Sequence, residues 1–236
     1  MLRDSASLPP RFAAYVANLA LEPPPPGTSH YPGLASRPWH EPSEIPLARA
    51  LEANAAAIVR ELRAVADGDF IRESENIPRR GRWEVAFLYE RGRRHDGLAA
   101  RCPATMAAID GARTVRTQSG LAYLSRLSAA SHVAPHRGPT NLRLRCHFGV
   151  DVPEECGLMV GGEERTWSVG RCLVFDDSFE HEAWNRDVHD RIVLIVDVWH
   201  PDLSDEEVRL LEGFDRYVAS RARNLARYHE LNAARS

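Results

Sequence analysis

The sequence predicts a mainly β protein with flanking helices, whose core is a sandwich or a jelly-roll barrel. Short runs of β-favouring residues, separated by turn residues, follow one another from Leu121 over about seventy positions. The dipeptide Gly161-Gly162 lies between two of these runs and is typical of a hairpin turn. Segments with helical periodicity come before and after the β-rich region, so we expect helices at both flanks.

The chain has 236 residues, of which 44% are hydrophobic and 27% charged, as expected for one compact domain with an added subdomain. We expect a single domain over residues 1–236. Its parts are a Pro-rich extended arm at 1–46, a helical and strand flank at 47–120, a jelly-roll core at 121–202 and a C-terminal helix at 203–236. The arm holds ten of the 16 prolines, which lack the backbone N–H that regular structure needs.

The N-terminal flank has three predicted elements. Ser43 is a candidate N-cap, and apolar residues then recur at helical spacing until Asp67-Gly68 ends the helix. The run from Trp83 to Tyr89 alternates and predicts a strand, and the run from Pro103 to Ile109 predicts a short helix.

The core and the C-terminal flank follow. Five runs in the core predict strands: LAYLSRL, NLRLRCHFGV, CGLMV, RCLVF and RIVLIVDVWH. Beyond them, Ser204 and Glu207 have the spacing of a capping box, so we expect the last helix to begin there.

The overall charge argues against some classes of partner. Thirty basic residues against 33 acidic ones give a net charge of -3 and a pI near 6.4, so no basic field is available for a nucleic acid. The apolar stretch from Phe12 to Leu21 is too short to span a bilayer, and no secretion signal precedes it. We therefore expect a soluble cytoplasmic protein that does not bind nucleic acid or insert stably into a membrane.

The cysteines show no metal-binding spacing, and we expect them to be buried as small apolar residues. They are Cys102, Cys146, Cys156 and Cys172. A disulfide between Cys146 and Cys156 can be drawn, but an intracellular setting argues against it.

Two histidines near strand edges are candidates for a metal site. His136 and His181 are 45 residues apart, a separation that lets a hairpin array bring both to one mouth of a barrel. Neutral imidazole is a common ligand for iron, copper, nickel and zinc. A single histidine is more often a hydrogen-bonded structural residue, so the spacing alone leaves both interpretations open.

The strand NLRLRCHFGV divides into two faces, because side chains alternate across a strand. One face carries Leu142, Leu144, Cys146 and Phe148, and the other carries Arg143, Arg145 and His147. Three basic groups therefore project together. The alternative is a solvated face whose arginines pair with nearby acidic residues, namely Glu154, Glu155, Glu163 or Glu164.

Arg191 opens the last predicted strand, ten residues after His181. At a barrel mouth a guanidinium can grip a carboxylate through two parallel hydrogen bonds, which suits a dicarboxylate co-substrate. The alternative is an ion pair with an aspartate close in sequence: Asp187, Asp190 or Asp197.

Several motifs, in order, resemble the aspartyl/asparaginyl β-hydroxylase family of iron(II) and 2-oxoglutarate-dependent oxygenases. They are HVAPHRGPTNLRLRCHFGV, ERTWSVGRCLVFDDSFEHEAWN and RIVLIVDVWHP. The resemblance is strongest from about Leu124 to Leu203 and is weaker upstream. It implies a double-stranded β-helix, the cupin-like jelly roll of these oxygenases, with its catalytic core in residues 121–202.

The resemblance also implies a metal site. His136 and His181 match the two iron ligands of the family. Gly138 stands where most oxygenases of the larger superfamily have an Asp or Glu, and the resembled family has glycine there too. Asp176 and Asp177 are the available replacement carboxylates, but we expect them to bind backbone groups in the FDDS turn.

Further roles follow from the same resemblance. Arg191 matches the arginine for the distal carboxylate of 2-oxoglutarate, and His147 and Ser125 match residues that contact the same co-substrate. Arg143 and Arg145 match positions that bind the carboxylate of an aspartyl or asparaginyl substrate.

Trp167, Trp184 and Trp199 are expected to pack in the core or at its rim. Tyr89 is expected to line the substrate pocket, by analogy with an aromatic residue of the family. Arg137 has no assigned role.

The implied activity is hydroxylation of the β-carbon of an aspartyl or asparaginyl group, with Fe(II), 2-oxoglutarate and O2. The substrate could be a peptide, a carrier-bound or free amino acid, or another small acid, and the oligomeric state is not predicted. One alternative is a non-haem iron halogenase, since glycine in place of the carboxylate leaves room for chloride. The other is a cupin-like protein that binds a metal and a small acid without turnover.

Overall fold

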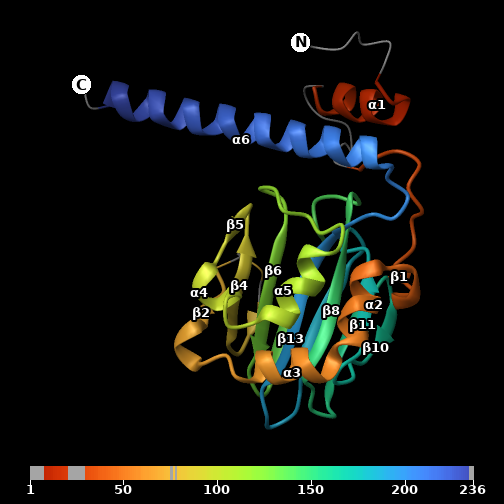
Figure 1. Ribbon diagram of the computed structural model, residues 1–236, viewed down its shortest axis with the longest axis vertical. Coiled ribbons are helices and arrows are strands. Elements are labelled where there is room, and N and C mark those ends of the chain that lie inside the picture. The colour runs from red at the N-terminus through yellow and green to blue at the C-terminus, as the bar shows by residue number, and fades with distance from the viewer. Residues whose placement is uncertain (1–7, 21–29, 75–76, 78, 234–236) are drawn as a thin grey trace.

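The computed structural model describes residues 8–20, 30–74, 77 and 79–233, and two antiparallel β-sheets dominate it (Figure 1). Its strands are β1 (Trp39–His40), β2 (Ile71–Arg72), β3 (Arg79–Arg80), β4 (Trp83–Glu90), β5 (Arg93–Arg94), β6 (Leu121–Leu127), β7 (Ser131–His136), β8 (Arg143–Asp151), β9 (Cys156–Val160), β10 (Glu163–Arg165), β11 (Cys172–Phe175), β12 (His181–Asn185) and β13 (Arg191–Trp199). Its α-helices are α1 (Pro10–Leu19), α2 (Pro46–Ala53), α3 (Ala55–Arg63), α4 (Asp96–Ala99), α5 (Pro103–Asp110) and α6 (Asp205–Ala233).

The strand order is that of a jelly roll, as the sequence predicts. The larger sheet has the order β1-β11-β8-β13-β6-β4-β2, with β5 paired to β4, and the smaller has the order β10-β9-β12-β7-β3. Many neighbours in these sheets are distant in sequence, as in a double-stranded β-helix. The larger sheet includes β4 and β1, so it extends beyond the core predicted at 121–202.

The central strands of the larger sheet are buried on both faces. Helices α2, α3 and α5 cover its outer face, and its inner face packs against the smaller sheet (Figure 1). Strand β13 shows the consequence, because Leu194 and Val196 enter the core under the helices while Val193 and Ile195 enter the core between the sheets. Burial on both faces explains why this strand reads as a continuous apolar run.

The helix predicted from Ser43 to Asp67 is wrong in its bounds. A short 3-10 turn spans Pro42–Glu44, α2 begins at Pro46 without a side-chain cap, and the helical path divides at Asn54. The Asn54 side chain donates a hydrogen bond to the carbonyl of Ala50 at 2.9 Å. Such local bonds compete with helix continuation, which fits the division between α2 and α3.

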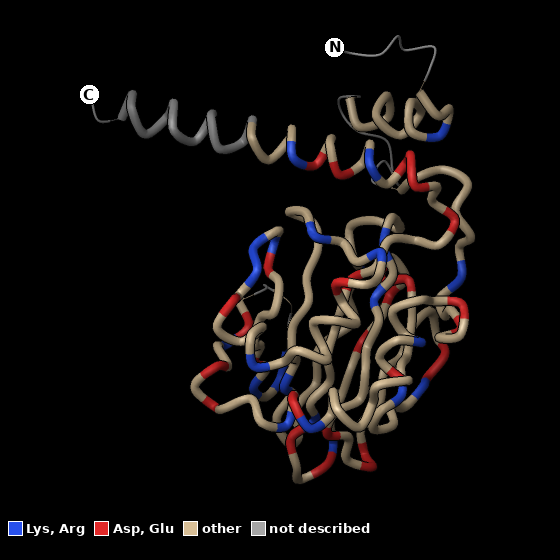
Figure 2. Tube along the Cα trace, in the orientation of Figure 1, with Lys and Arg blue, Asp and Glu red and all other residues tan. Residues whose placement is uncertain are grey.

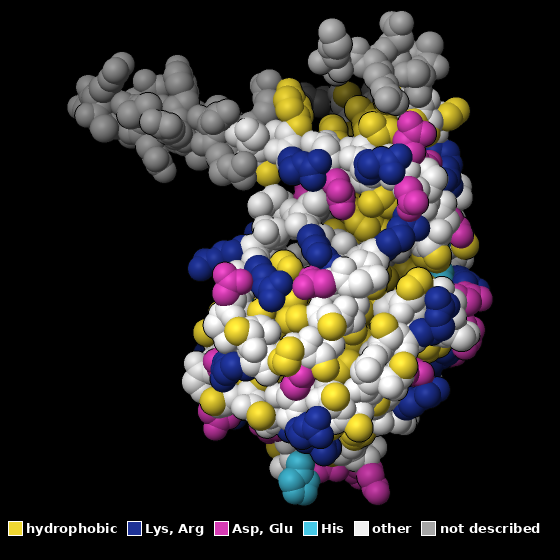
Figure 3. Space-filling view, viewed as in Figure 1, with side chains coloured by type: hydrophobic (Ala, Val, Ile, Leu, Met, Phe, Trp, Pro, Cys, Tyr) yellow, Lys and Arg dark blue, Asp and Glu magenta, His cyan; other side chains and the backbone are white. Residues whose placement is uncertain are grey.

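The expected extended arm at 1–46 is wrong for Pro10–Leu19, which forms α1. Proline at the first helical position is compatible with a helix, and Phe12 and Tyr15 are buried on its inner side. The run Pro23–Pro26 lies outside the described residues. Apolar side chains gather where α1 and the start of α6 meet the body (Figure 3).

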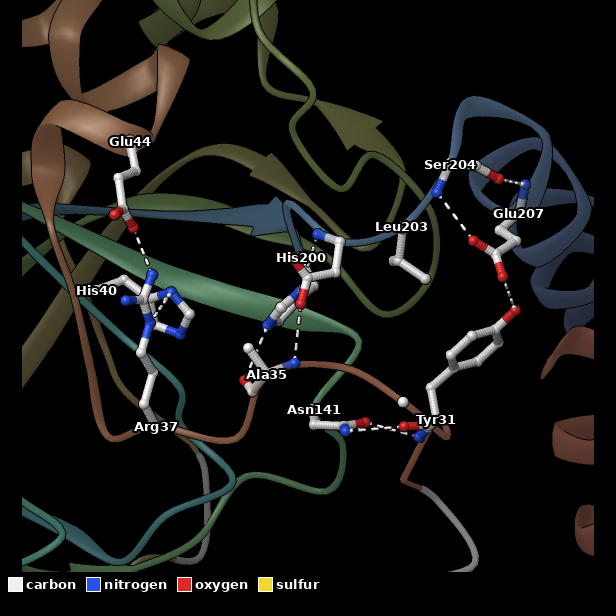
Figure 4. A network of polar contacts seen from close by, with 12 residues as sticks. Tyr31, Ala35, Arg37, His40, Glu44, Asn141, His200, Leu203, Ser204 and Glu207 are labelled. Atoms are coloured by element: carbon white, nitrogen blue, oxygen red, sulfur yellow. Dashed lines mark hydrogen bonds and ion pairs between the residues drawn. The ribbon is translucent and has the colours of Figure 1, made fainter.

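The predicted capping box at the start of α6 is confirmed and has additional partners. Ser204 and Glu207 exchange hydrogen bonds at 2.9 and 3.2 Å. Glu207 also accepts from the Tyr31 hydroxyl at 2.8 Å (Figure 4). It pairs with Arg11 at 2.6 Å. These bonds hold the pKa of Glu207 at about 2 despite burial, so one carboxylate joins α6, α1 and the segment at Tyr31.

The predicted hairpin at Gly161-Gly162 is also confirmed. Both glycines have positive φ, 57° and 85°, and β9 pairs with β10 across them. Strands β7 and β12 have no counterpart among the predicted strands, although they carry the two candidate metal ligands.

Candidate active site

His136 and His181 lie opposite one another on neighbouring strands. Strand β7 ends at His136, β12 begins at His181, and the two residues are paired in the antiparallel register of the smaller sheet. Their ring centroids are 4.1 Å apart. The strand pairing therefore joins two imidazoles that are far apart in the chain, as the barrel-mouth argument predicts.

Backbone carbonyls fix the orientation of both rings. Nδ1 of His136 lies 2.8 Å from the carbonyl oxygen of Ala134, and Nδ1 of His181 lies 2.9 Å from that of Phe179. A proton on Nδ1 in each bond leaves the lone pair on Nε2, the tautomer that a metal ion needs. Burial, together with His136, lowers the pKa of His181 to about 4, so this ring is neutral at neutral pH.

Among the described residues, no carboxylate joins the two histidines as a third metal ligand. At Gly138 a Cβ atom would lie 2.4 Å from the carboxyl carbon of Asp177, so the space beside the glycine is already filled. The backbone N–H of Gly138 also donates to the carbonyl of Asp177 at 2.6 Å. In the described part of the chain, no group of three histidine, cysteine or acidic residues could hold a metal.

The two aspartates of the FDDS turn behave differently. Asp176 accepts a hydrogen bond from the backbone N–H of Ser178 at 2.9 Å, as predicted. The prediction is wrong for the Asp177 carboxylate, which lies 2.9 Å from Nε of Arg145 and 3.5 Å from Nη2 of Arg143. Charged partners on β8, the neighbouring strand of the same sheet, replace the backbone of the turn, and the local sequence does not reveal them.

One side of the two histidines is a small inner pocket of about 40 Å³. We call it the inner pocket; it is lined by Ser125, His147, Trp167 and Arg191 together with His136, Arg145, His181 and several apolar residues. Arg191 is 2% exposed, and its guanidinium lies 4.8 Å from the centroid of Trp167. Burial lowers the pKa of Arg191 to about 10, which leaves the side chain charged at neutral pH.

The aspartates proposed as alternative partners of Arg191 are bound elsewhere. Asp187 lies 3.0 Å from Nδ1 of His189, Asp190 accepts from the N–H of Ala129, and Asp197 faces two other arginines. Over the described ranges, no carboxylate lies within ion-pair distance of Arg191. The buried guanidinium therefore lacks a counterion from those residues.

Unsatisfied polar atoms show what the inner pocket is suited to hold. Both ring nitrogens of His147 and Nε of Arg191 are buried without a hydrogen-bond partner among the described residues. Burial and the nearby Arg191 lower the pKa of His147 far below its usual value, so the ring is neutral. Ser125 accepts a bond from Trp83 Nε1 at 2.9 Å and retains its own hydroxyl proton. Buried polar groups of this kind are normally satisfied, and an anionic ligand with oxygen acceptors would satisfy them.

The other side of the histidines opens into a larger cavity of about 480 Å³, which we call the outer chamber. Its lining includes Arg91, Gln118, Ser119, Arg137, Gly138, Arg143 and Asp177, with His136, Arg145 and His181 shared with the inner pocket. The two histidines therefore stand at the junction of the two cavities.

The predicted face of β8 is confirmed, since Leu144, Cys146 and Phe148 enter the core under the helices while the alternate side chains face the cavities. The predicted glutamate partners of the arginines are wrong. Arg143 and Arg145 lie instead against the buried carboxylates of Asp177 and Asp197, at 2.9 to 3.7 Å. Arg143 also donates to the carbonyl of Ser119.

The structure thus brings together all seven residues singled out in the sequence, which are Ser125, His136, Arg143, Arg145, His147, His181 and Arg191. Tyr89 is not among the lining residues, because its hydroxyl points toward Asp110, 3.3 Å away. Sequence reasoning missed Asp177 and Asp197 as partners of the arginines. The acidic residue at 197 inside an otherwise apolar strand was the available signal.

The chain matches the family model described as aspartyl/asparaginyl beta-hydroxylase over residues 52–201. It belongs to this family. The aspartyl/asparaginyl beta-hydroxylases of Mus musculus and Homo sapiens are each 38% identical over 187 residues, which cover 76% of this chain and 25% of the relative. The human aspartate beta-hydroxylase domain-containing protein 1 is 35% identical over 201 residues, or 79% of this chain and 50% of the relative.

This member of the aspartyl/asparaginyl β-hydroxylase family therefore spans only a quarter to half of the length of these relatives. Among solved structures, a predicted oxalate decarboxylase from Thermotoga maritima aligns with a TM-score of 0.38 and 16% identity, covering 58% of this chain and 98% of that one. None of the helices in the described ranges combines the length and apolar character needed to cross a bilayer.

Proposed function

We propose that the protein is an Fe(II)- and 2-oxoglutarate-dependent dioxygenase that hydroxylates the β-carbon of an aspartyl or asparaginyl group. One observation carries the proposal: two oriented imidazoles lie between a buried pocket, whose guanidinium has no carboxylate partner in the described part of the chain, and an open chamber lined by arginines. A metal at the two rings could reach a co-substrate on one side and a substrate on the other.

His136 and His181 would hold the iron, with their Nδ1 bonds to carbonyls keeping Nε2 available as a donor. Bound iron with 2-oxoglutarate and O2 supplies the oxidative chemistry, in which 2-oxoglutarate becomes succinate and carbon dioxide. The aromatic and aliphatic walls of the inner pocket, such as Trp167 and Phe175, exclude water from this side.

Arg191, His147 and Ser125 would bind 2-oxoglutarate. The planar guanidinium of Arg191 can take the distal carboxylate through two bonds, which would give the buried charge its missing counterion. Neutral His147 and the Ser125 hydroxyl are positioned to donate to the same ligand.

Arg143 and Arg145 would bind the carboxylate or amide of the substrate. Their pairs with Asp177 and Asp197 hold the guanidinium groups in place before substrate arrives. We extend the proposal to a peptide, a carrier-bound or a free amino acid as substrate. We also propose a cytoplasmic location, since all four cysteines are free and buried.

The test is a coupled assay for succinate and oxygen consumption with Fe(II), ascorbate and 2-oxoglutarate. Candidate substrates are aspartate-bearing peptides, free amino acids and carrier-tethered aspartate, with mass spectrometry to detect the gain of one oxygen atom. His136→Ala and His181→Ala should each abolish substrate-dependent succinate. The matched control is His132→Ala, because His132 lies on the same strand but pairs with Glu182 at 2.6 Å, away from the site.

Unchanged turnover in either ligand variant would refute the iron assignment. A chlorinated product in chloride buffer would favour the halogenase. Retained zinc with no oxygen consumption on any substrate would favour the non-catalytic binding protein.

A further inference from the structure

The hairpin between β4 and β5 ends in the turn Arg91-Gly92, whose backbone does not suit its first residue. Arg91 has φ 48° and Gly92 has φ 81°, and Glu90 pairs with Arg93 across the turn. Two positive φ values are those of a type I′ turn, which favours Asn, Asp or Gly at its first position. Arginine adopts this conformation only at a cost in free energy, which indicates that its side chain has a function.

The tip of this hairpin is tied to the wall of the outer chamber. The N–H of Arg91 donates to the carbonyl of Gly120 at 3.1 Å, and Gln118 Nε2 donates to the carbonyl of Arg91 at 3.0 Å. Gln118 and Ser119 line the chamber, and so does Arg91 itself. The turn is therefore anchored where the Arg91 side chain borders the space in which the substrate would bind.

The charge of Arg91 is not offset by a neighbour in the described ranges. Where the structure describes the chain, no acidic group lies within ion-pair distance of its guanidinium, whereas the inner arginines of the chamber face Asp177 and Asp197. Basic residues gather at this hairpin (Figure 2), although the chain as a whole has a net charge of -3.

A second arginine lines the same chamber. Arg137 lies 3.7 Å from Glu180, and both side chains are 61% exposed, so solvent screens this pair. With the inner arginines balanced by buried aspartates, Arg91 and Arg137 leave the chamber positively charged. A ligand filling it would meet an excess of guanidinium groups.

We propose that Arg91, assisted by Arg137, selects peptide substrates that carry a further acidic side chain beside the residue that reacts. This inference rests on the proposed function, because it assumes that the outer chamber receives the substrate. Arg91 touches the acidic neighbour and not the reacting atoms, so it determines specificity and takes no part in the chemical step. The contact is charge-assisted and partly solvated, so it weakens with salt.

The first experiment measures binding to the full chain without turnover. Two fluorescent peptides of equal length carry one central aspartate flanked either by Glu or by Gln, and anisotropy is followed at low and high NaCl. We expect the Glu-flanked peptide to bind about tenfold more tightly at low salt, with the advantage shrinking at high salt. Equal affinities at low salt, or no binding of either peptide, would overturn the inference.

Three variants identify the source of the preference. Arg91→Gln should remove most of the advantage of the Glu-flanked peptide, and Arg91→Lys should keep much of it. Arg93→Gln is the matched control, because Arg93 is exposed on the same hairpin, changes the same charge and does not line the chamber. If Arg93→Gln loses the preference for the Glu-flanked peptide to the same extent, the preference comes from the overall charge of the hairpin. That result would overturn the specific role of Arg91.

A stability measurement separates a specificity role from a structural one. Arg91→Asn places a favoured residue in the type I′ turn, so its Tm should rise by about 2 °C while the peptide preference falls. A lower Tm in Arg91→Asn would mean that arginine holds the turn, and would overturn the argument from conformation.

Kinetics distinguish failure of this inference from failure of the proposed function. If a Glu-flanked peptide is hydroxylated, Arg91→Gln should raise its KM about tenfold and leave kcat unchanged. Hydroxylation with equal KM for the two peptides would overturn the inference alone. Absence of oxidation on every substrate would overturn the proposed function, while the anisotropy result would still decide the binding preference.

Discussion

The inner pocket and the outer chamber share His136, Arg145 and His181, but their buried charges are balanced in different ways. In the inner pocket, Arg191 is buried without a carboxylate among the described residues, and His147 has no hydrogen-bond partner. In the outer chamber, two arginines already face two buried aspartates. A buried unpaired charge costs stability unless a ligand neutralises it. The buried charge of the inner pocket therefore needs a ligand to neutralise it, whereas the two inner arginines of the outer chamber are neutralised before a ligand binds.

The largest expected effect tests whether Asp197 neutralises the two arginines in the lining of the outer chamber. Asp197→Asn keeps the shape of the side chain and the acceptor for the N–H of Leu121, but leaves Arg143 and Arg145 with one carboxylate. Urea unfolding should show a loss of about 3 kcal/mol, the range for breaking a buried pair. Asp151→Asn is the control, because its pair with Arg63 is exposed and should contribute less than about 1 kcal/mol. Equal losses of unfolding free energy in the two variants would mean that Asp197 does not neutralise Arg143 and Arg145.

The next effect tests the inner pocket. Arg191→Met should raise the KM for 2-oxoglutarate by about 100-fold, which corresponds to roughly 2.7 kcal/mol. It should not lower the free energy of unfolding, because it removes a buried charge that has no counterion where the structure describes the chain. Arg143→Met should change that KM less than about threefold. Equal KM values in the two variants would remove the distinction between the cavities.

A smaller effect concerns a buried histidine on β1, the strand that pairs with β11. His40 is 1% exposed, and β1 holds it beside β11, the strand that leads into Asp177. Burial, with further contributions from Arg37 and His200, lowers the pKa of His40 from 6.5 to about 4, while Glu44 and Asp202 oppose the shift (Figure 4). Because the unfolded chain binds the proton more readily, His40 stabilises the fold above pH 6.5, and this contribution is lost as the pH falls toward 4.

Between pH 7 and pH 5 this histidine should account for about 2 kcal/mol of lost unfolding free energy. His40→Gln should reduce the pH dependence by that amount in urea titrations at the two pH values. His189→Gln, at an exposed position, should leave it unchanged. A pH dependence in His40→Gln that matches the parent chain would contradict the assignment to His40.

The smallest effect tests how tightly Gly138 packs against Asp177 in the lining of the outer chamber. Gly138→Ala would place a methyl group 2.4 Å from the Asp177 carboxyl carbon and force that side chain away from Arg145. We expect a loss of about 1 to 2 kcal/mol of stability by thermal unfolding. Gly68→Ala, where a Cβ would meet nothing within 4 Å, is the control. Full stability in Gly138→Ala would show that Asp177 can move without cost.

Much of the fold could be read from local patterns. The alternation in β8 correctly assigned Arg143, Arg145 and His147 to one face, because strand geometry fixes that alternation wherever the strand lies. The helical signal in α1 was missed, because the prolines around it suggested extended chain. Strand β7 was missed as well, since it is short and contains Pro135.

The sequence by itself determined the sheet-rich core, the capping box at Ser204, the hairpin at Gly161-Gly162 and, through motif resemblance, the candidate site residues. These features depend on neighbours within a few positions, where backbone geometry and hydrogen bonding are local. Only the tertiary structure decided which charges meet. Asp177 and Asp197 reach the arginines of β8 from other strands and turns, and Arg191 is left without such a partner among the residues that the structure describes. Pairing between strands that are distant in sequence depends on strand order and burial, which no local pattern specifies.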